Sequence, residues 1–319
     1  MAILQYPAGP GTATPAAQAV VASRAPLRVR LKKALPAYLF ILPGMILFLV
    51  WTVYPLVYSF VMSFAEWNLI KPSEFVGVNN YTRAVKDPLF WTALVNTLMY
   101  VAITVPGQMI LGLGIALLLD APLRGRAFFR TIYYIPVVTS WVVVSLIFTY
   151  LYNGQAGFIN WFLRDLLHVI PKNVNWLGEP LLANIAIASL GIYKGLGWTS
   201  VIFLAGLQSV PSEVYEAAAL DGTTAWSRLR YITLPLIRQT TLFLLVILTI
   251  GGFQVFISVF IMTGGNPLHR TDVLLTYMYS NAFESLDLGY GAALSYLFAF
   301  LVFTLSIAQI RLLRRPVQY

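Results

Sequence analysis

The chain has 319 residues, of which 59% are hydrophobic and 10% are charged, a composition typical of a protein with several membrane-spanning helices rather than a soluble domain. It contains no cysteine and two histidines, which excludes disulfides and thiolate metal sites, and we expect no bound metal. The formal net charge of +9 does not predict nucleic-acid binding, because basic residues in a membrane protein first report its orientation.

The N-terminal region differs from the rest of the chain. Residues 1–23 are rich in Ala, Pro, Gly and Thr and predict a disordered tail. Residues 24–35 contain five Lys and Arg among leucines and valines, and they predict a collar at the cytoplasmic membrane surface. We therefore assign 1–35 to the tail and collar, 36–90 to the first transmembrane helix with its outer loop, and 91–315 to the membrane core.

Six apolar segments follow, and each is long enough to cross about 30 Å of hydrocarbon as a helix. They lie near residues 38–63, 94–118, 131–152, 181–209, 237–262 and 290–312. If the N-terminus is cytoplasmic, the inner segments hold fourteen Lys and Arg and the outer segments hold six. The six segments predict an all-α membrane protein with six transmembrane helices, and the charge bias places both termini in the cytoplasm.

The outer loops carry tryptophans, which commonly anchor a chain at the membrane interface. These are Trp67, Trp91, Trp161 and Trp176. Residues 158–169 have apolar side chains at helical spacing, so they predict a short helix along the outer surface.

The fourth span contains Lys194, the one charge deep in an apolar segment. A lysine inside the membrane costs roughly 2.5–3.5 kcal/mol, so we expect its ammonium to face a wet cavity, a partner or exposed carbonyls. The neighbouring glycines are Gly191, Gly195 and Gly197. In one interpretation these glycines are packing notches and Lys194 extends to an interface. In the other, the span borders a solute path, with Tyr193, Gly197 and Ser200 on one face.

Such a face suits a sugar, because an aromatic ring stacks on a pyranose while hydroxyls and amides bind its hydroxyl groups. In the second span, Asn96 and Gln108 are expected to bridge helices, which is the commoner use of buried amides in membranes.

The loop over residues 211–236 is charged and is punctuated by proline and glycine. Pro211 ends the fourth span, and Ser212 is expected to cap a short helix that the Asp221-Gly222 pair breaks. A second short helix is expected to begin near Thr223 or Thr224.

The consecutive alanines 217–219 remove side-chain bulk, which allows another surface to approach the first helix of this loop closely. Asp221 is expected to cap the next turn or to pair with Arg228 or Arg230.

The motifs Glu216-Ala-Ala-Ala-Leu-Asp-Gly222 and Ile232-Thr-Leu-Pro235 resemble the "EAA loop" of the membrane subunits of binding-protein-dependent ABC importers. Leu229 and Arg238 depart mildly from that family, which often has Phe and Pro there. Further segments resemble the carbohydrate-uptake branch, the maltose and glycerol-phosphate type. They are Phe75-Val-Gly-Val-Asn-Asn-Tyr81, Asn96-Thr97 with Tyr100, Arg126-Ala-Phe-Phe-Arg130 with Pro136, and Thr263-Gly-Gly-Asn-Pro267.

The resemblance implies a type I ABC importer permease fold and a coupling loop that docks on an ATP-hydrolysing subunit. The implied coupling residues are Glu216, Ala217, Ala218, Asp221, Gly222, Leu234 and Pro235. The implied partners are a second permease, two ATP-binding subunits, an extracytoplasmic substrate-binding protein, membrane lipid and a sugar or related solute. ATP and Mg would be bound by the ATPase, in the plasma membrane of a bacterium or archaeon. Substrate contacts in that family come from the fourth and fifth spans, which adds Phe253 and Gln254 to the candidates.

No Gly-x-x-x-x-Gly-Lys-Ser/Thr phosphate loop, Ser/His/Asp arrangement or carboxylate pair within one span occurs in the sequence, so we expect no enzymatic activity and no catalytic residue in this chain. The rival interpretation is a secondary transporter that works without an ATPase. It is disfavoured because the spans contain almost no acidic residues that could relay protons. A membrane scaffold or enzyme is a third alternative.

Overall fold

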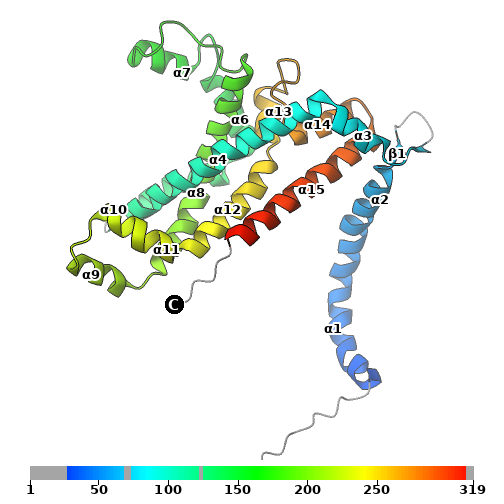
Figure 1. Ribbon diagram of the computed structural model, residues 1–319, viewed down its shortest axis with the longest axis horizontal. Coiled ribbons are helices and arrows are strands. Elements are labelled where there is room, and N and C mark those ends of the chain that lie inside the picture. Colours follow the sequence, from blue (N-terminus) through cyan, green and yellow to red (C-terminus); the bar gives the residue numbers. More distant parts are fainter. Residues whose placement is uncertain (1–26, 68–72, 122–124, 314–319) are drawn as a thin grey trace, which may run out of the picture. The chain divides into compact units, whose positions relative to one another are not determined.

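The computed structural model describes residues 27–67, 73–121 and 125–313, and these residues are mainly helical (Figure 1). The tail predicted over residues 1–23 lies outside the described residues. The elements are α1 Leu27–Phe48, α2 Tyr54–Met62, β1 Ala65–Glu66, β2 Glu74–Phe75, α3 Asn79–Lys86, α4 Pro88–Asp120, α5 Arg126–Val138, α6 Trp141–Leu151, α7 Phe158–Trp161, α8 Pro180–Gln208, α9 Ser212–Leu220, α10 Ala225–Arg228, α11 Leu234–Leu236, α12 Arg238–Phe253, α13 Ile257–Met262, α14 Leu274–Tyr279 and α15 Leu288–Leu313. Single π-helical turns lie at Leu49–Val53, Phe162–Leu166, Leu229–Thr233 and Ser280–Glu284.

The chain divides into two compact units, one ending at Leu56 and the other beginning at Val57. Within the described residues, four helices are long and apolar enough to cross a membrane. They are Tyr38–Met62, Pro88–Asp120, Pro180–Gln208 and Leu288–Arg311. Two further bent helix pairs raise the number to six if each pair is one span. The all-α fold and the predicted first, second, fourth and sixth spans agree with this arrangement. The bent pairs are Arg126–Val138 with Trp141–Leu151, and Ala225–Leu236 with Arg238–Phe253, so the second pair begins before the fifth span predicted over residues 237–262.

The third span is not the single helix predicted over residues 131–152. Helix α5 ends at Val138, α6 begins at Trp141, and the two are bent by 96°. Thr139 and Ser140 between them have extended backbones, with ψ of 145° and 136°. The residues before the break are β-branched, which weakens the local preference for a helix.

The fifth span is also broken, which corrects the continuous helix predicted over residues 237–262. Helix α12 ends at Phe253 and α13 begins at Ile257. Gly251 and Gly252 precede the break, and each glycine costs about 1 kcal/mol relative to alanine inside a helix. The pattern of hydrophobic residues continues across both breaks, so hydropathy alone does not reveal them.

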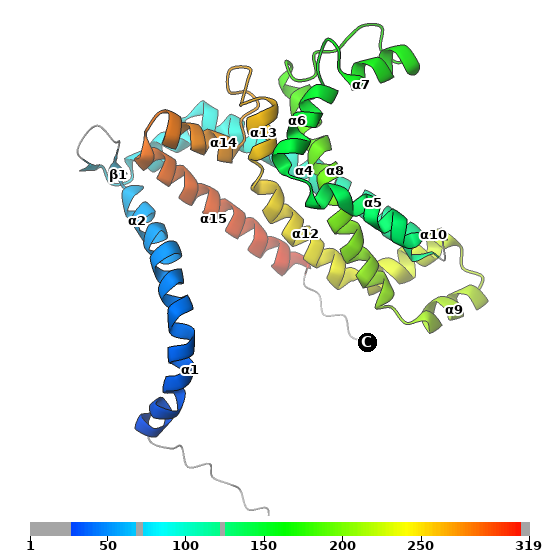
Figure 2. The ribbon, with the colours of Figure 1, turned by 180° about the vertical axis from the view of Figure 1, so that it is seen from behind.

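Helix α8 is the central helix of the second unit, where it packs along α4 and also contacts α5 and α12 (Figure 2). Glycines allow these helices to approach closely. A Cβ on Gly112 of α4 would lie 2.7 Å from the Thr199 side chain of α8, and a Cβ on Gly206 would lie 2.7 Å from the Thr240 hydroxyl of α12. Close packing of small residues is the usual way for helices to associate in a membrane.

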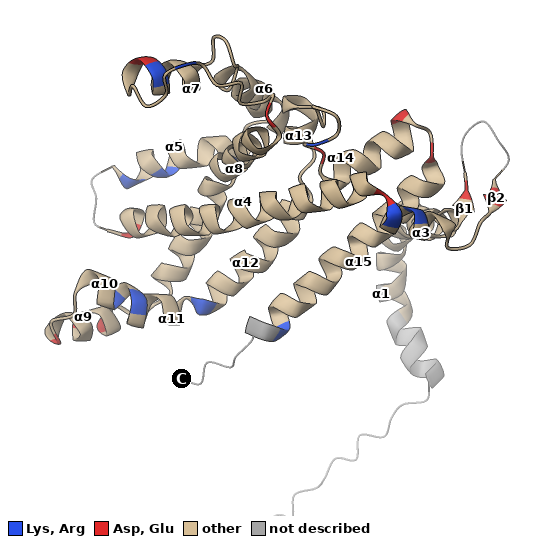
Figure 3. Ribbon diagram, turned by 45° about the horizontal axis from the view of Figure 1, so that its top comes forward, with Lys and Arg blue, Asp and Glu red and all other residues tan. Residues whose placement is uncertain are grey.

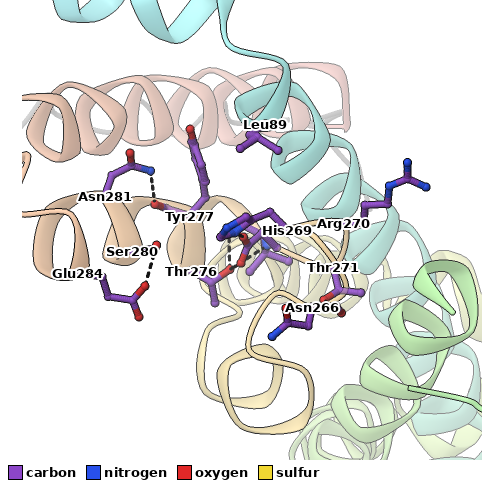
Figure 4. A network of polar contacts seen from close by, with 12 residues as sticks. Leu89, Asn266, His269, Arg270, Thr271, Thr276, Tyr277, Ser280, Asn281 and Glu284 are labelled. Carbon is purple, nitrogen blue, oxygen red and sulfur yellow. Dashed lines mark hydrogen bonds and ion pairs between the residues drawn. The ribbon is translucent and has the colours of Figure 1, made fainter. Parts of the chain in front are cut away.

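Polar side chains connect α4 and α8 with the segment that precedes α14. Figure 4 shows His269 of this segment close to Thr276 of α14. The Asp272 carboxylate is buried and contacts the Nδ1 atom of His269 at 2.7 Å. Asn96 of α4 donates to the carbonyl of Asp272 at 2.8 Å, and Asn184 of α8 donates to Asn96 at 3.2 Å. The Gln108 amide of α4 donates to a carbonyl of α8 at 3.2 Å. Both of these amides of the second span therefore bridge helices, as predicted.

The predicted short helix over residues 158–169 is present as α7 and the π-helical turn that follows it. The loop is built around Asn160, which is 1% exposed. Its amide donates to the carbonyl of Val174 at 3.0 Å, and its side-chain oxygen accepts from the indole of Trp176 at 2.9 Å. Interface anchoring by the tryptophans stays a prediction.

Asp87 connects the beginning of α4 to α14 and α15. Its carboxylate accepts hydrogen bonds from the hydroxyls of Tyr277 and Tyr290, the latter at 2.8 Å, and from the amide of Leu89 at 2.9 Å. Burial acts to raise the pKa of Asp87, but the hydrogen bonds from the two tyrosines and from the amides of Leu89 and Phe90 hold it below its usual value.

A carboxyl whose pKa is lower in the folded state contributes stability above its unfolded pKa of about 3.9 and loses it as the pH falls through the folded pKa. We therefore expect the melting temperature of the purified chain to fall in this acid range, and Asp87→Asn to flatten that dependence. Thermal unfolding in detergent between pH 3 and 7 measures both curves. Parallel curves for the two proteins would contradict this role for Asp87.

Candidate functional site

The loop between α8 and α12 forms the predicted helix, break and second helix. At the end of α9, the amide of Thr223 donates to the carbonyl of Ala218 at 3.2 Å, and the amide of Gly222 donates to that of Ala219 at 3.1 Å. Gly222 has a φ of +70°, the left-handed conformation that this type of helix end requires. The predicted break at Asp221-Gly222 is confirmed, and the motif accounts for it.

Two expectations for the loop are wrong. Ser212 does not cap α9, because it is the first residue of the helix and Pro211 occupies the capping position without a side-chain hydrogen bond. Asp221 forms no ion pair with either arginine among the described residues. The hydroxyl of Thr224 caps α10 instead, accepting from the amide of Ser227 at 3.2 Å, and this agrees with the predicted helix start.

Part of the loop surface is apolar and exposed. Ala218 is buried against the rest of the loop, whereas Glu216 and Ala217 are exposed. Leu220 is 91% exposed and Trp226 is 68% exposed. Exposed apolar side chains of this kind mark contact sites for another protein or for the membrane.

Beside this surface, a cavity of about 620 Å³ separates α10 from the ends of α4 and α8. It is lined by Leu117, Asp120, Ala121, Leu207, Tyr215, Ala225, Trp226, Arg228, Leu229 and Thr233. Figure 3 shows basic residues of α10 and of the beginning of α12 near this end of the helices.

The fourth span, α8, uses its glycines for packing. A Cβ on Gly197 would lie 2.2 Å from the carbonyl oxygen of Tyr133 in α5. A Cβ on Gly191 would lie 2.2 Å from the hydroxyl of Tyr100, and one on Gly195 would overlap the Gln108 side chain of α4. These positions have no room for a side chain, which favours the packing interpretation of the glycines.

The Lys194 ammonium is directed at the break in the third span. It donates to the carbonyls of Pro136 at 2.7 Å, Val137 at 3.1 Å and Thr139, and the side chain is 5% exposed. It also lies 5.1 Å from the centre of the Trp141 ring. Exposed carbonyls were one of the three surroundings expected for this charge, and the structure shows them around the ammonium.

Two cavities lie near these breaks. One of about 270 Å³ is lined in part by α8, and one of about 360 Å³ is lined by residues of α4, α6, α12 and α13 and of the break between α12 and α13. Their walls share Tyr100, Trp141 and Gly251. Gln108, Trp198 and Gly252 are among the further residues of the first, and Gln254 and Phe256 are among those of the second. Both breaks in the spans therefore border the same cavities.

Of the six solute-path candidates, Gln254 lines a cavity. Tyr193 is 45% exposed, and its ring lies 5.5 Å from that of Phe148. Ser200 is buried and donates to the carbonyl of Gly197 within α8 at 2.9 Å, and Phe253 is buried at the end of α12. Sequence reasoning missed Tyr100, Trp141 and Trp198 as cavity residues. Each is an aromatic residue with a polar atom inside an apolar span, and this pattern could have identified them.

Broken spans, cavities between helices and an exposed helical loop define a class, the multi-span α-helical transport proteins of membranes. Residues 108–315 match the family described as "Binding-protein-dependent transport system inner membrane component". The chain belongs to this family.

Relatives support this assignment. The chain is 35% identical to a probable ABC transporter permease protein of Pyrococcus horikoshii, over 81% of this chain and 88% of that protein. It is 33% identical to the trehalose/maltose transport system permease protein MalF of Thermococcus litoralis, over 89% and 95% of the two chains. A chain of the bacterial ABC transporter involved in the import of the acidic polysaccharide alginate has the same fold, with a TM-score of 0.80, 24% identity and coverage of 92% and 99%.

Proposed function

We propose that this chain is one of two permease subunits of an ABC importer and that it carries a neutral sugar or a related polyhydroxy solute. Its partners are a second permease, two ATP-binding subunits that hold ATP and Mg, and an extracytoplasmic substrate-binding protein. Membership of the family supports the importer, and the trehalose/maltose relative supports the solute class. A structural neighbour was solved with a periplasmic protein bound, which supports the last partner.

The chemistry of the two cavities carries the solute assignment. Their walls combine aromatic rings with the amides of Gln108 and Gln254, and no charged residue is among the described residues that line them. Aromatic faces and neutral amides suit the alternating apolar and hydroxyl surfaces of a sugar. A lining without charge also favours a neutral solute over an anion.

The exposed loop is the proposed contact with the ATPase. Its surface residues include Glu216, Ala217, Leu220 and Trp226, and the loop joins α8 directly to α12. A displacement of the loop therefore acts on both helices that border the cavities, and rigid-body transmission of this kind is a common coupling device.

We place both termini and this loop in the cytoplasm on the basis of the bias of Lys and Arg. Reporter fusions at about residues 165 and 275 should report the outside of the cell, and fusions at about 125 and 222 the inside. A cytoplasmic signal from residue 165 would overturn this orientation and move the loop out of reach of ATP.

Reconstitution in proteoliposomes with the second permease, the ATP-binding subunits and the substrate-binding protein tests the importer. Screening the binding protein against sugars, polyols and sugar phosphates selects the labelled solute. We expect uptake that requires ATP and that persists when the proton gradient is collapsed. Uptake driven by a proton gradient without ATP would favour the secondary transporter instead, and a binding protein that retains anions alone would contradict the neutral solute.

Trp141→Ala and Gln254→Ala should each lower uptake by roughly tenfold, which corresponds to about 1.4 kcal/mol. The physical reason is the loss of a stacking surface or a hydrogen-bonding amide from the cavity wall. Tyr193→Ala is the comparison, because Tyr193 lines neither cavity. Initial uptake rates at equal transporter content measure the three variants. A larger loss for Tyr193→Ala would move the solute path to the face of α8 predicted from the sequence.

A further inference from the structure

The break in the third span leaves helix-end carbonyls that need partners. The last carbonyls of a helix accept no hydrogen bond from within the helix. A buried carbonyl that stays unpaired costs free energy comparable to a lost hydrogen bond. The carbonyl of Ile135 is paired with the amide and the hydroxyl of Thr139, at 3.2 and 2.8 Å. The carbonyls of Pro136, Val137 and Thr139 are paired with the Lys194 ammonium.

This pairing uses the whole hydrogen-bonding capacity of Lys194. A lysine ammonium has three N–H donors and no acceptor, and three carbonyls accept from it. The C-terminal end of a helix carries partial negative charge, so a cation is also favoured there electrostatically. Lys194 therefore has no donor left for a solute, and its effect on transport must pass through the backbone that it holds.

Trp141 connects the backbone at this break to the two cavities. It is the first residue of α6, its ring lies 5.1 Å from the Lys194 ammonium, and it lines both cavities. Helix α6 also packs against α13, the helix that follows the break in the fifth span. The direction of α6 after its bend thus fixes the position of the Trp141 ring beside Gln254.

We propose that Lys194 is a positioning residue of the transport pathway: by binding the carbonyls at the end of α5, it keeps the third span broken and holds Trp141 in the cavity wall. The part that concerns transport rests on the proposed importer function, whereas the part that concerns the break does not. Two measurements on the assembled transporter separate these parts.

The first measurement is the distance across the break. The chain has no cysteine, so Phe128→Cys and Tyr150→Cys place a spin-label pair on α5 and α6 without removing any native thiol. At 1.5 Å per residue, a 96° bend puts the two Cα atoms about 21 Å apart, against about 33 Å in a continuous helix. We expect the short distance in the parent protein and a shift toward the long distance in Lys194→Met, which keeps the apolar stem but has no donors.

Thr199→Val is the matched control on α8, because its buried hydroxyl has no hydrogen-bond partner among the described residues. It should keep the short distance. Lys194→Gln is the second variant in case Lys194→Met does not assemble; it retains two neutral donors and should give a mixture of both distances. A single short distance in the Met or Gln variant, equal to that of the parent, would overturn the role of Lys194 in the break.

The second measurement reports the pathway rather than stability. In transporter that co-purifies with its ATPase, Gln254→Cys is labelled with a charged methanethiosulfonate, with and without ATP and vanadate. We expect the nucleotide to change the labelling rate at least fivefold, and Lys194→Met to remove most of that change while Thr199→Val keeps it. An unchanged response in Lys194→Met would overturn positioning of the pathway. No response in any variant would count against the importer itself, and the spin-label distances would still decide the role in the break.

Discussion

Ala217→Arg should abolish co-purification of the ATP-hydrolysing subunit, the largest effect that we expect from any single substitution. Ala217 is exposed beside Glu216, on the surface proposed to dock on the ATPase. Added bulk at a close-packed contact typically costs 1–3 kcal/mol, so binding should weaken about tenfold or more. Affinity purification from membranes followed by quantification of both subunits measures the effect.

Ala156→Arg is the matched control, because it places the same side chain on an exposed alanine outside the coupling loop. It should leave co-purification unchanged, and both variants should insert into the membrane at normal levels. If Ala217→Arg retained the ATPase at the level of the control, the exposed loop would not be the docking element.

Gly197→Ala should destabilise the chain strongly, although it adds a single methyl group. The new Cβ would lie 2.2 Å from the carbonyl oxygen of Tyr133 and 2.8 Å from the Val137 side chain. The contact is with backbone, so no side-chain rotation relieves it, and α5 must move away from α8. A cost of 1–3 kcal/mol corresponds to a melting temperature lower by roughly 1.5–4.5 °C for a chain of this length.

Gly114→Ala, in the neighbouring helix α4, is the control variant that we do not expect to destabilise the chain. Nothing lies within 4 Å of a Cβ at this position, and alanine is favoured over glycine in a helix by about 1 kcal/mol. The melting temperature should therefore be unchanged or higher. Equal melting temperatures for the Gly197 and Gly114 variants would mean that α5 and α8 are not in close contact, and the bond between Lys194 and α5 would lose its basis.

The features that sequence reasoning predicted are those that local physical chemistry determines. Apolar length gives the spans, and the loop at Asp221-Gly222 follows from turn chemistry, because glycine adopts a positive φ that other residues resist. The start of the second helix after Thr224 belongs to the same group. The error at Ser212 is small, because Pro211 already has the extended backbone of a capping residue.

The features that sequence reasoning could not predict depend on contacts between residues that are distant in the sequence. Lys194 contacts carbonyls 55 to 58 residues earlier in the chain, and no local pattern shows that the third span opens to receive it. The cavity walls likewise join Tyr100, Trp141 and Gln254 from three different spans. The sequence alone therefore singled out Lys194 but left open whether it extends to an interface or borders a solute path, whereas the geometry pairs it with backbone carbonyls.

The uncharged lining of the two cavities has an electrical consequence. A charge that crosses the membrane gains or loses about 2.3 kcal/mol per 100 mV of membrane voltage. With the Lys194 ammonium fixed on backbone carbonyls and a neutral solute in the cavities, no charge would be displaced through the field during translocation. The proposed importer should then work at the same rate in a polarised and a depolarised membrane, and the direction of transport would come from ATP hydrolysis alone.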